Sequence, residues 1–474
     1  MDVGALENFS SLEALLQSRK ADLVDYFYND TVAPHVKATP GLTPVPVERS
    51  NWAEEQKAWR NAAVLFDQSH HMPELFVRGP GAMALLSSLG VNTFANFVPG
   101  RAKQFIACNP QGQVIGESLM YCHGPEDFEL VSGMPMINWV EYNAGLGKHD
   151  VQVLRDNNTA RNPNGKRIKF RFGMDGPNAV KILADAVEGG HVPEIPFFHT
   201  ATFRIAGCDV MALRHGMAGH RGVEISGRYE DMETVRGALL AAGEKHGLKQ
   251  GGTLAYFTTV GESGWMASPF PAIFTSPELK PYREHLPATT WEGSAQLGGS
   301  FVSGDIEDYY VTPWDLGVEA RIKFDHDFVG RAALEAMAAE PTRTRRTLVW
   351  DNADVSNIFS SMLEPGLAVK QLRLPYASYA YQQYDTVKTP DGKIVGYSTW
   401  AGYSANESKV LSLVMIDRAH AEIGTELVLT WGEPNGGSRK AHVERHRQAD
   451  VRVTVGKAPY PEAVQQMKHA AVTT

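Results

Sequence analysis

Apolar residues recur along the first 340 residues with two spacings, one helical and one alternating. Three- and four-residue spacing predicts helices over residues 5–28, 52–63, 82–89, a segment ending near 142, and 229–245. Alternation or short apolar runs predict strands over residues 73–78, 104–108, 114–121, 128–131 and 151–154, with a second strand–helix–strand set from residue 168. Helices interleaved with short strands indicate an α+β fold.

The pattern changes after residue 340. Residues 341–346 (PTRTRR) are predicted to be a linker, and strands and turns dominate from there. The strands are expected over residues 347–350, 393–398, 409–416, 426–430 and 451–455. This part of the chain therefore predicts a separate β-rich domain, either a barrel or a sandwich.

The segment from His215 to Ile225 (HGMAGHRGVEI) places three glycines within seven residues, directly before an alternating strand pattern. Glycine lets the backbone turn through positive φ, or lets a flat ligand approach the main chain. The strand carries one carboxylate, Glu224, which could accept two hydrogen bonds from the edge of a planar heterocycle. A tight turn before a strand whose Glu224 faces water is the alternative, and spacing alone favours that alternative.

Composition limits the classes of partner. The 474 residues are enough for two to four domains, and 43% hydrophobic with 21% charged residues is typical of a globular protein. With a net charge of −9 and no basic run longer than Arg345-Arg346, we expect neither a nucleic-acid partner nor an anionic membrane surface. Three sparse cysteines, no leader pattern and no apolar run of membrane length predict a cytoplasmic protein. The sequence gives no indication of an oligomeric state.

Common catalytic motifs are absent from the sequence. It contains no dinucleotide or P-loop glycine pattern, no zinc-protease motif and no nucleophile elbow. The neighbouring His70 and His71 would point to opposite faces of a strand, so no metal site is predicted. Polar and aromatic residues in glycine-rich loops remain, and together they suit a pocket for two flat aromatic molecules, although each alone is more often structural: Gln68, His71, Gln104, Glu224, Tyr256 and Trp265.

Several motifs resemble those of the aminomethyltransferase superfamily, the T-proteins of glycine cleavage. They are the Gly-x-x-Gly-x-Glu-Ile turn at 219–225, the run KFDHDFVGR at 323–331, and the β-rich C-terminal part that ends near 458–460. Further runs resemble more closely the tetrahydrofolate-dependent aryl O-demethylases of vanillate, syringate and 3-O-methylgallate. These runs are residues 59–61, 64–72, 102–104, 213–219, 262–265 and 299–310. They are spread over nearly the whole chain.

The resemblance implies a three-domain T-protein-like fold: two ferredoxin-like αβ domains and a C-terminal β-barrel around a central folate channel. It implies that residues 1–340 form two interleaved units, approximately 51–160 with 251–340 and 1–50 with 161–250. Residues 341–474 would form the barrel.

The implied activity is transfer of a methyl group from a small methoxylated aromatic acid to N5 of tetrahydrofolate, the co-substrate. The products would be 5-methyltetrahydrofolate and a catechol-type phenol, in the breakdown of lignin aromatics. By motif, Glu224 would hold the pterin edge. The folate would be lined by Gln68, Gln104, Val131 and Trp265. Tyr256 and His71 would lie beside the aryl ether, and Tyr28 would close the substrate side.

These roles agree with the chemistry of the bond. An aryl methyl ether is a poor electrophile because an aryloxide must leave, so a hydrogen bond or proton at the ether oxygen matters most. Tyr256, with an ordinary pKa of about 10, could act as a hydrogen-bond donor or as a general acid. His71 could bind or deprotonate the neighbouring ring hydroxyl.

Two positions depart from the related patterns. Gly116, followed by Glu117, stands where aminomethyltransferases carry an aspartate, which disfavours aminomethyl transfer. Gly133 stands where vanillate-type demethylases place an arginine for the substrate carboxylate, and its small size favours a dimethoxylated ring such as syringate. The alternatives are a folate-dependent demethylase of a sulfonium or N-methyl substrate, and a non-catalytic folate-binding protein that would need neither Tyr256 nor His71.

Overall fold

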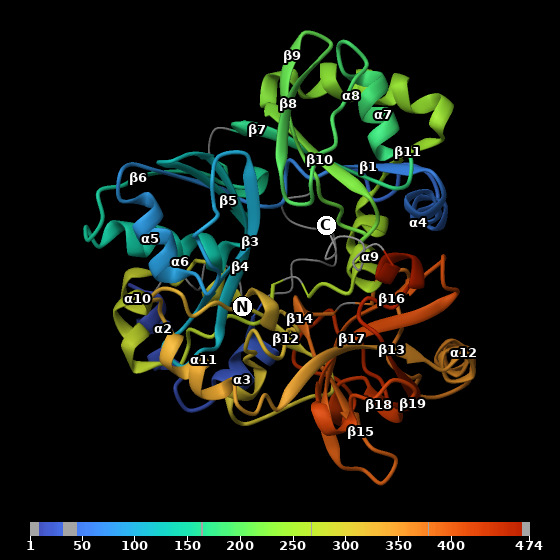
Figure 1. Ribbon diagram of the computed structural model, residues 1–474. Helices are drawn as coiled ribbons and strands as arrows, with labels where there is room; N and C mark the ends of the chain where they lie inside the picture. The colour runs from blue at the N-terminus through green and yellow to red at the C-terminus, as the bar shows by residue number, and fades with distance from the viewer. Residues whose placement is uncertain (1–8, 32–44, 163–164, 267, 378, 467–474) are drawn as a thin grey trace.

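A computed structural model of the chain describes residues 9–31, 45–162, 165–266, 268–377 and 379–466. Three lobes surround a common centre (Figure 1). The first lobe is built on a five-stranded sheet, the second on a six-stranded sheet, and the third is a closed six-stranded barrel. The predicted α+β fold with a C-terminal barrel is therefore confirmed.

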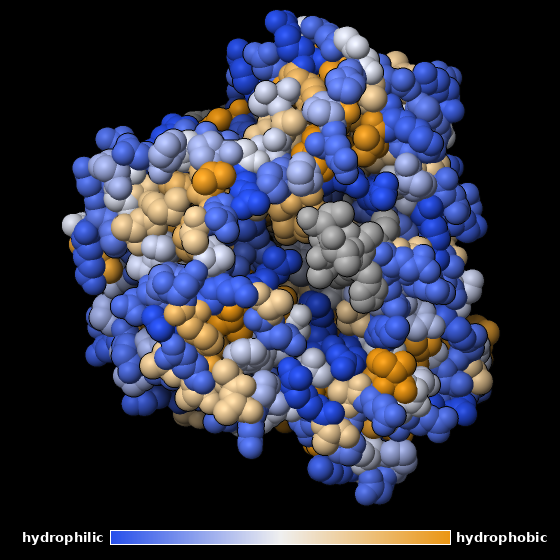
Figure 2. Space-filling model, in the orientation of Figure 1, coloured by the Kyte–Doolittle hydropathy of each residue, from blue (hydrophilic) through white to orange (hydrophobic). Residues whose placement is uncertain are grey.

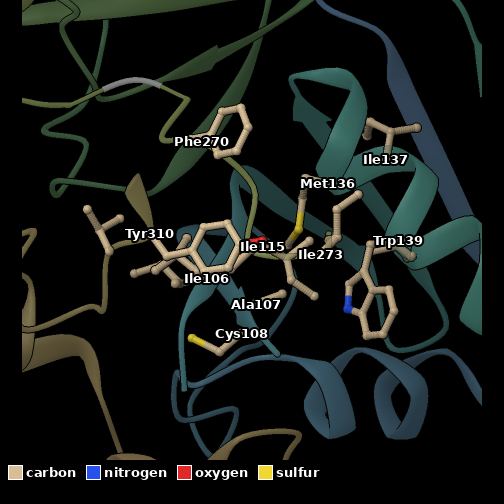
Figure 3. Close-up of a cluster of buried hydrophobic side chains, with 14 of the residues drawn as sticks. Ile106, Ala107, Cys108, Ile115, Met136, Ile137, Trp139, Phe270, Ile273 and Tyr310 are labelled. Carbon is tan, nitrogen blue, oxygen red and sulfur yellow. The ribbon is translucent and has the colours of Figure 1, made fainter. Parts of the chain in front are cut away.

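The first lobe is an antiparallel sheet in the order β3-β4-β5-β2-β6. Its strands are β2 (Glu74–Arg78), β3 (Arg101–Cys108), β4 (Val114–Gly124), β5 (Asp127–Ser132) and β6 (Gln152–Asp156). Helices α5 (Ala82–Leu89), α6 (Met134–Gly145), α10 (Lys280–His285) and α11 (Arg331–Met337) belong to its core. At one end the other face is also apolar, where Ile106 and Ile115 lie near Tyr310 (Figure 3). Beyond that end, strand alternation places Glu117 and Tyr121 on this second face.

The second lobe is a sheet in the order β11-β1-β7-β10-β9-β8, in which only the β1–β11 pair is parallel. Its strands are β1 (Ala63–Asp67), β7 (Lys169–Asp175), β8 (Thr200–Ile205), β9 (Cys208–Leu213), β10 (Gly222–Arg228) and β11 (Leu248–Gly251). Helices α7 (Ala179–Ala186) and α8 (Met232–Gly243) cover one face. In β7, Phe170 and Phe172 join that core, so alternation turns Arg171 and Asp175 to the opposite face.

Two further helices connect the second lobe to the barrel. Helix α4 (Trp52–Asn61) and helix α9 (Thr253–Ser263) pack together beside the end of β1. The buried carboxylate of Glu262 accepts hydrogen bonds from Nε1 of Trp59 at 2.9 Å and from Oγ of Ser404 at 2.6 Å. Tyr256 lies in the first turn of α9, which begins two residues after the end of β11 at Gly251.

The barrel closes in the order β13-β17-β16-β15-β18-β19. Its strands are β13 (Arg343–Trp350), β15 (Asp385–Lys388), β16 (Ile394–Ser404), β17 (Lys409–Asp417), β18 (Glu426–Trp431) and β19 (Ala449–Gly456), with helix α12 (Asn352–Ser360) outside. A short ladder of β12 (Leu297–Gly298) and β14 (Gln382–Gln383) connects it to the preceding segment. The predicted linker at 341–346 is wrong in part, because β13 already begins at Arg343 and pairs there with Asp417.

The N-terminal helices α2 (Leu12–Ser18) and α3 (Leu23–Asp25), and a π-helical turn at Tyr26–Asp30, pack with the first lobe. Nε of Arg283 in α10 donates to Glu13 of α2 at 2.6 Å. The interleaving of residues 1–340 stays a prediction, but these contacts group the segments differently from it. Helix α2 joins the lobe of 74–156, whereas β1 pairs with β7 and β11 of the other sheet. A local pattern predicts a strand without specifying its partner.

None of the helices within the described ranges is long and apolar enough to cross a bilayer.

Candidate active site

The hydroxyl of Tyr256 and Nε2 of His71 lie 3.0 Å apart. Tyr256 comes from α9, and His71 comes from the loop after β1. Phe66 of β1 packs edge-on against the tyrosine ring at 5.4 Å, which fixes its orientation. His70 turns away and contacts Oγ1 of Thr159 through Nδ1. The structure therefore places the two predicted catalytic side chains together and separates the two adjacent histidines.

Both members of the pair are uncharged at neutral pH. Burial, with the charges of Arg171 and Arg167, lowers the pKa of His71 to about 3. Burial and the nearby Glu224 carboxylate raise the pKa of Tyr256 above its usual range. A neutral imidazole has one donor and one acceptor nitrogen, and Nδ1 of His71 is buried without a hydrogen-bond partner. The pair can therefore offer a ligand two hydrogen bonds, one at Nδ1 of His71 and one at the hydroxyl of Tyr256.

Glu224 lies on β10 and is buried, rather than facing water. Oε2 accepts from Nη2 of Arg171 at 2.5 Å, and more weakly from the hydroxyl of Tyr121 at 3.4 Å, while Oε1 is 2.9 Å from Nδ1 of His215. Burial alone would raise the pKa of Glu224, but the charges of Arg171 and His215 lower it to about 2. The carboxylate is thus ionised, with lone-pair capacity left mainly on Oε1.

The glycine-rich segment before β10 packs closely on a protein carboxyl. Gly219 has a φ of +77° and makes the turn. A Cβ at Gly222 or Gly216 would lie 2.3 or 2.9 Å from Oδ1 of Asp175, so both positions need glycine to approach that side chain. Oδ2 of Asp175 accepts from the backbone N–H of Ala218 at 2.7 Å. The turn therefore positions Glu224 by packing on Asp175.

Gln104 and Trp265 meet at a carboxyl that was not assigned a site role from the sequence. Both side chains hydrogen-bond Glu117, with Nε2 of Gln104 donating to Oε2. Burial raises the pKa of Glu117 to about 7, although these bonds and the charges of Arg345 and Arg321 oppose the shift. Glu117 therefore binds its proton more tightly than an exposed glutamate does.

Val131 is buried on β5 in a small cluster with Tyr121 and Leu213, between the two sheets. Phe198 packs against this cluster with a φ of +57°, and its ring stacks on His215 at 5.4 Å. Neither Tyr121 nor Phe198 was predicted as a site residue. The alternation along β4 places Tyr121 on the same face of the strand as Glu117, but no local pattern marks Phe198.

Tyr28 lies in a different environment from the His71–Tyr256 pair. Its hydroxyl donates to the backbone carbonyl of Gly299, and its ring is buried in the core of the first lobe. Burial, together with the charges of Glu433 and Asp385, raises its pKa far above the usual range. Its substrate role therefore stays a prediction. Within 4 Å of a Cβ built at Gly133 the described residues place Oγ of Ser268 and Cδ of Pro135, but no charged atom.

Two buried polar atoms at the pair lack a hydrogen-bond partner among the described residues, Nδ1 of His71 and Nη1 of Arg171. The side chain of Gln68 hydrogen-bonds Tyr256 and lies against Gly173. Unsatisfied nitrogens of this kind are costly, and a ligand with several donors and acceptors would satisfy them. A pterin has that character, so these residues fit a folate. Figure 2 shows a recess lined by hydrophilic residues at the centre between the lobes.

A groove of about 870 Å³ lies elsewhere, along β8, β9 and β10 of the second sheet. It is lined by His123, Lys169, Met211 and Ser226, among other residues, and not by the predicted site residues.

Among the described residues, no group of three His, Cys, Asp or Glu side chains is placed to hold a metal ion.

The family model described as the GCVT N-terminal domain matches residues 25–268, just over half of the chain. The chain belongs to this family. The match includes Gln68, His71, Glu224 and Tyr256, so the site lies within the GCVT domain.

Two relatives of this GCVT protein carry names of one-carbon transfer. Syringate O-demethylase of Sphingobium sp. (strain NBRC 103272 / SYK-6) is 44% identical over 450 residues, 95% of this chain and 96% of the relative. Sesamin methylene transferase of Sinomonas sp. (strain No.22) is 28% identical over 433 residues, 88% of this chain and 90% of the relative. The resemblance to folate-dependent demethylases of the T-protein superfamily, and the prediction of a methyl-transferring enzyme, are confirmed.

A solved structure supports the fold alone. The glycine cleavage system aminomethyltransferase T from Bartonella henselae superposes with a TM-score of 0.58 at 18% identity, over 87% of this chain and 90% of that chain. The T-protein-like fold is thereby confirmed.

Proposed function

We propose that this enzyme transfers the methyl group of a methoxylated aromatic acid, with syringate favoured, to N5 of tetrahydrofolate. The observation that carries the proposal is the buried, uncharged His71–Tyr256 pair beside the ionised Glu224. In the reaction the methyl–oxygen bond of the ether breaks and a methyl–nitrogen bond forms. The proton lost from N5 is balanced by the proton gained by the phenol, so no redox partner is required.

Tyr256 acts at the ether oxygen in this proposal. Its hydroxyl is protonated at neutral pH, because burial raises its pKa, and it can donate a hydrogen bond to the leaving aryloxide. His71 remains neutral down to a pH of about 3, so it can accept a hydrogen bond from a ring hydroxyl next to the ether. Their 3.0 Å contact keeps both groups on one edge of the substrate ring.

The folate side is formed by groups from both sheets. Glu224 is the acceptor for the pterin edge, and the amide of Gln68, over Gly173, and the guanidinium of Arg171 lie with it. Gln104, Val131 and Trp265 line the remainder of the folate. Tetrahydrofolate supplies the nucleophilic nitrogen. The protein's contribution is to hold that nitrogen about 3–3.5 Å from the methyl carbon, in line with the breaking bond.

The substrate proposal rests on Gly133 and on the 44% identical relative named syringate O-demethylase. A glycine there leaves room for a second methoxy group, as syringate requires. The location of the reaction follows from the same proposal: the enzyme acts in the breakdown of lignin-derived aromatic acids, and we expect it in the cytoplasm.

The test is incubation with tetrahydrofolate and syringate carrying carbon-13 in its methoxy groups. We expect labelled 5-methyltetrahydrofolate and the mono-demethylated phenol in equal amounts, and neither product when folate is omitted. Vanillate, 3-O-methylgallate and guaiacol are compared in parallel. A preference for guaiacol would contradict an acid substrate. Folate binding without methyl transfer from any methoxyarene would favour a binding protein, and transfer from a sulfonium or N-methyl donor would replace the proposal.

A further inference from the structure

Two arginines from outside the two sheets, Arg321 and Arg345, act electrostatically on Glu117 of the first sheet. Arg321 ends the 3₁₀ turn Glu319–Arg321, and its Cζ lies 5.8 Å from the ring centre of Phe198. That ring stacks on His215, which contacts Glu224. Arg345 projects from β13 of the barrel, on the same side as Arg343. Nη2 of Arg345 would lie 3.9 Å from a Cβ at Gly317, just before the turn that carries Arg321, and both arginines act on Glu117, which Gln104 contacts.

The positive charge of this pair is poorly compensated. Among the described residues, neither guanidinium takes part in an ion pair, and Nε of Arg345 is buried without a hydrogen-bond partner. Burial lowers the pKa of both side chains, that of Arg345 to about 10, so both stay charged at neutral pH. Glu117 is the carboxyl that acts on both.

Glu117 is a weak counter-charge for two arginines. Its pKa is raised by burial to about 7, and its carboxyl already accepts hydrogen bonds from Gln104 and Trp265. Both arginines are half-buried, and a guanidinium partly removed from water without a partner is costly, which is why such groups in proteins are usually paired with an anion. The planar guanidinium also matches a carboxylate in a bidentate geometry.

We propose that Arg321 and Arg345 form a binding site for a carboxylate of a ligand in the central recess. The identity of that ligand rests on the proposed function, which supplies two carboxylate sources. One is the aryl acid, for which Gly133 offers no cation. The other is the glutamyl part of tetrahydrofolate, since Gln104, Glu117 and Trp265 adjoin the same arginines.

The experiment compares ligand pairs that differ in the carboxylate. Tetrahydrofolate is compared with tetrahydropteroate, which lacks the glutamate, and syringate with 2,6-dimethoxyphenol. Dissociation constants are measured by calorimetry for wild type, Arg321→Met and Arg345→Met, and the Michaelis constants are measured where turnover occurs. Arg78→Met, an exposed arginine paired with Asp127, is the matched control. Thermal unfolding shows whether each variant is folded.

We expect wild type to bind one ligand about 10–100-fold more weakly when its carboxylate is removed. Each arginine variant should lose a similar factor for the intact ligand and none for the ligand without the carboxylate. The ligand pair whose two affinities differ shows which carboxylate binds the arginines, that of the aryl acid or that of the glutamyl part of tetrahydrofolate. If Arg345→Met does not fold, the proposal is tested by Arg321→Met and by the affinities of wild type for the ligands with and without the carboxylate. Wild-type affinities that are independent of both carboxylates would overturn the proposal, whereas methyl transfer in that same sample would leave the proposed function intact.

Discussion

At the scale of single residues, the His71–Tyr256 contact combines two shifts of pKa that both favour uncharged groups. The pKa of His71 is lowered to about 3 and that of Tyr256 is raised. At any pH between these two pKa values neither side chain changes its charge. The pair can therefore exchange hydrogen bonds with a substrate without gaining charge in a buried site. This suits a reaction in which negative charge develops on an ether oxygen.

Replacement of Tyr256 by phenylalanine keeps the ring packing on Phe66 but removes the hydroxyl. We expect the single-turnover rate of demethylation to fall by about 10²–10⁴-fold, the usual contribution of a general acid or hydrogen-bond donor. The affinity for tetrahydrofolate should change by less than about threefold, because the hydroxyl of Tyr256 is proposed to face the ether oxygen of the aryl substrate and not the folate. Rapid-quench kinetics and calorimetry measure the two quantities.

Tyr403→Phe is a matched control on β16, where the ring packs edge-on against Trp52. Its rate should equal that of wild type. An unchanged rate in Tyr256→Phe would remove Tyr256 from the chemistry and leave its hydroxyl as a structural partner of His71.

Most residues of the site could be named from the sequence, whereas the contacts between them could not. Tyr256, His71 and Glu224 were named from the family resemblance, since local spacing favoured structural roles for each of them. The ion pair of Glu224 with Arg171 was not predicted, because its two residues are 53 positions apart in the chain. The alternation around Arg171 (KFRFGMD) could have indicated a polar face of β7, but not the partner on β10.

At the scale of elements, the turn before β10 and the C-terminal segment depend on each other. Gly219 has a φ of +77°, and a Cβ there would lie 2.6 Å from Cγ1 of the buried Val464. We expect Gly219→Ala to lower the free energy of unfolding by about 2–4 kcal/mol, from left-handed backbone strain together with displaced packing. Urea denaturation measures the change.

The substitution Gly207→Ala separates the cost of left-handed backbone strain from the cost of displaced packing. Gly207 has a similar φ of +81°, but a Cβ there would meet nothing within 4 Å. Gly207→Ala should therefore lose only the backbone part, about 1–2 kcal/mol. Equal losses in the two variants would mean that Val464 moves aside without cost, and that the C-terminal segment does not hold the turn.

At the scale of the whole molecule, the sequence predicted the α+β class and the barrel because strand and helix periods are local properties. The grouping of segments into lobes depends on contacts between distant residues. β1 lies next to the first lobe in sequence, yet it pairs with β7 and β11 in the second. Phe198 is a similar case, since its left-handed backbone and its stacking on His215 arise only where the lobes meet.

The lobes also enclose carboxyls whose pKa is raised by burial. Asp175 has a pKa of about 6 and Glu117 about 7, each above its ordinary value. Between pH 4.5 and 7 the folded protein therefore holds more protons at these groups than the unfolded chain. Their contribution to stability is full below about pH 4 and is lost as pH rises through 6 to 7. His71, with its lowered pKa, opposes this trend because its contribution is lost as pH falls from about 6.5 toward 3.

We accordingly expect the free energy of unfolding to decrease between pH 5 and pH 7.5, and Asp175→Asn to reduce that decrease by on the order of 1–3 kcal/mol. Asparagine keeps an oxygen acceptor for the N–H of Ala218 but cannot ionise. Asp185→Asn is the control, since His246 and Lys245 lower the pKa of that exposed carboxyl, and it should leave the decrease unchanged. Denaturant titrations at the two pH values measure both variants. A decrease that persists in full in Asp175→Asn would show that Asp175 ionises without cost, and that the space between the lobes is more accessible to water than its burial indicates.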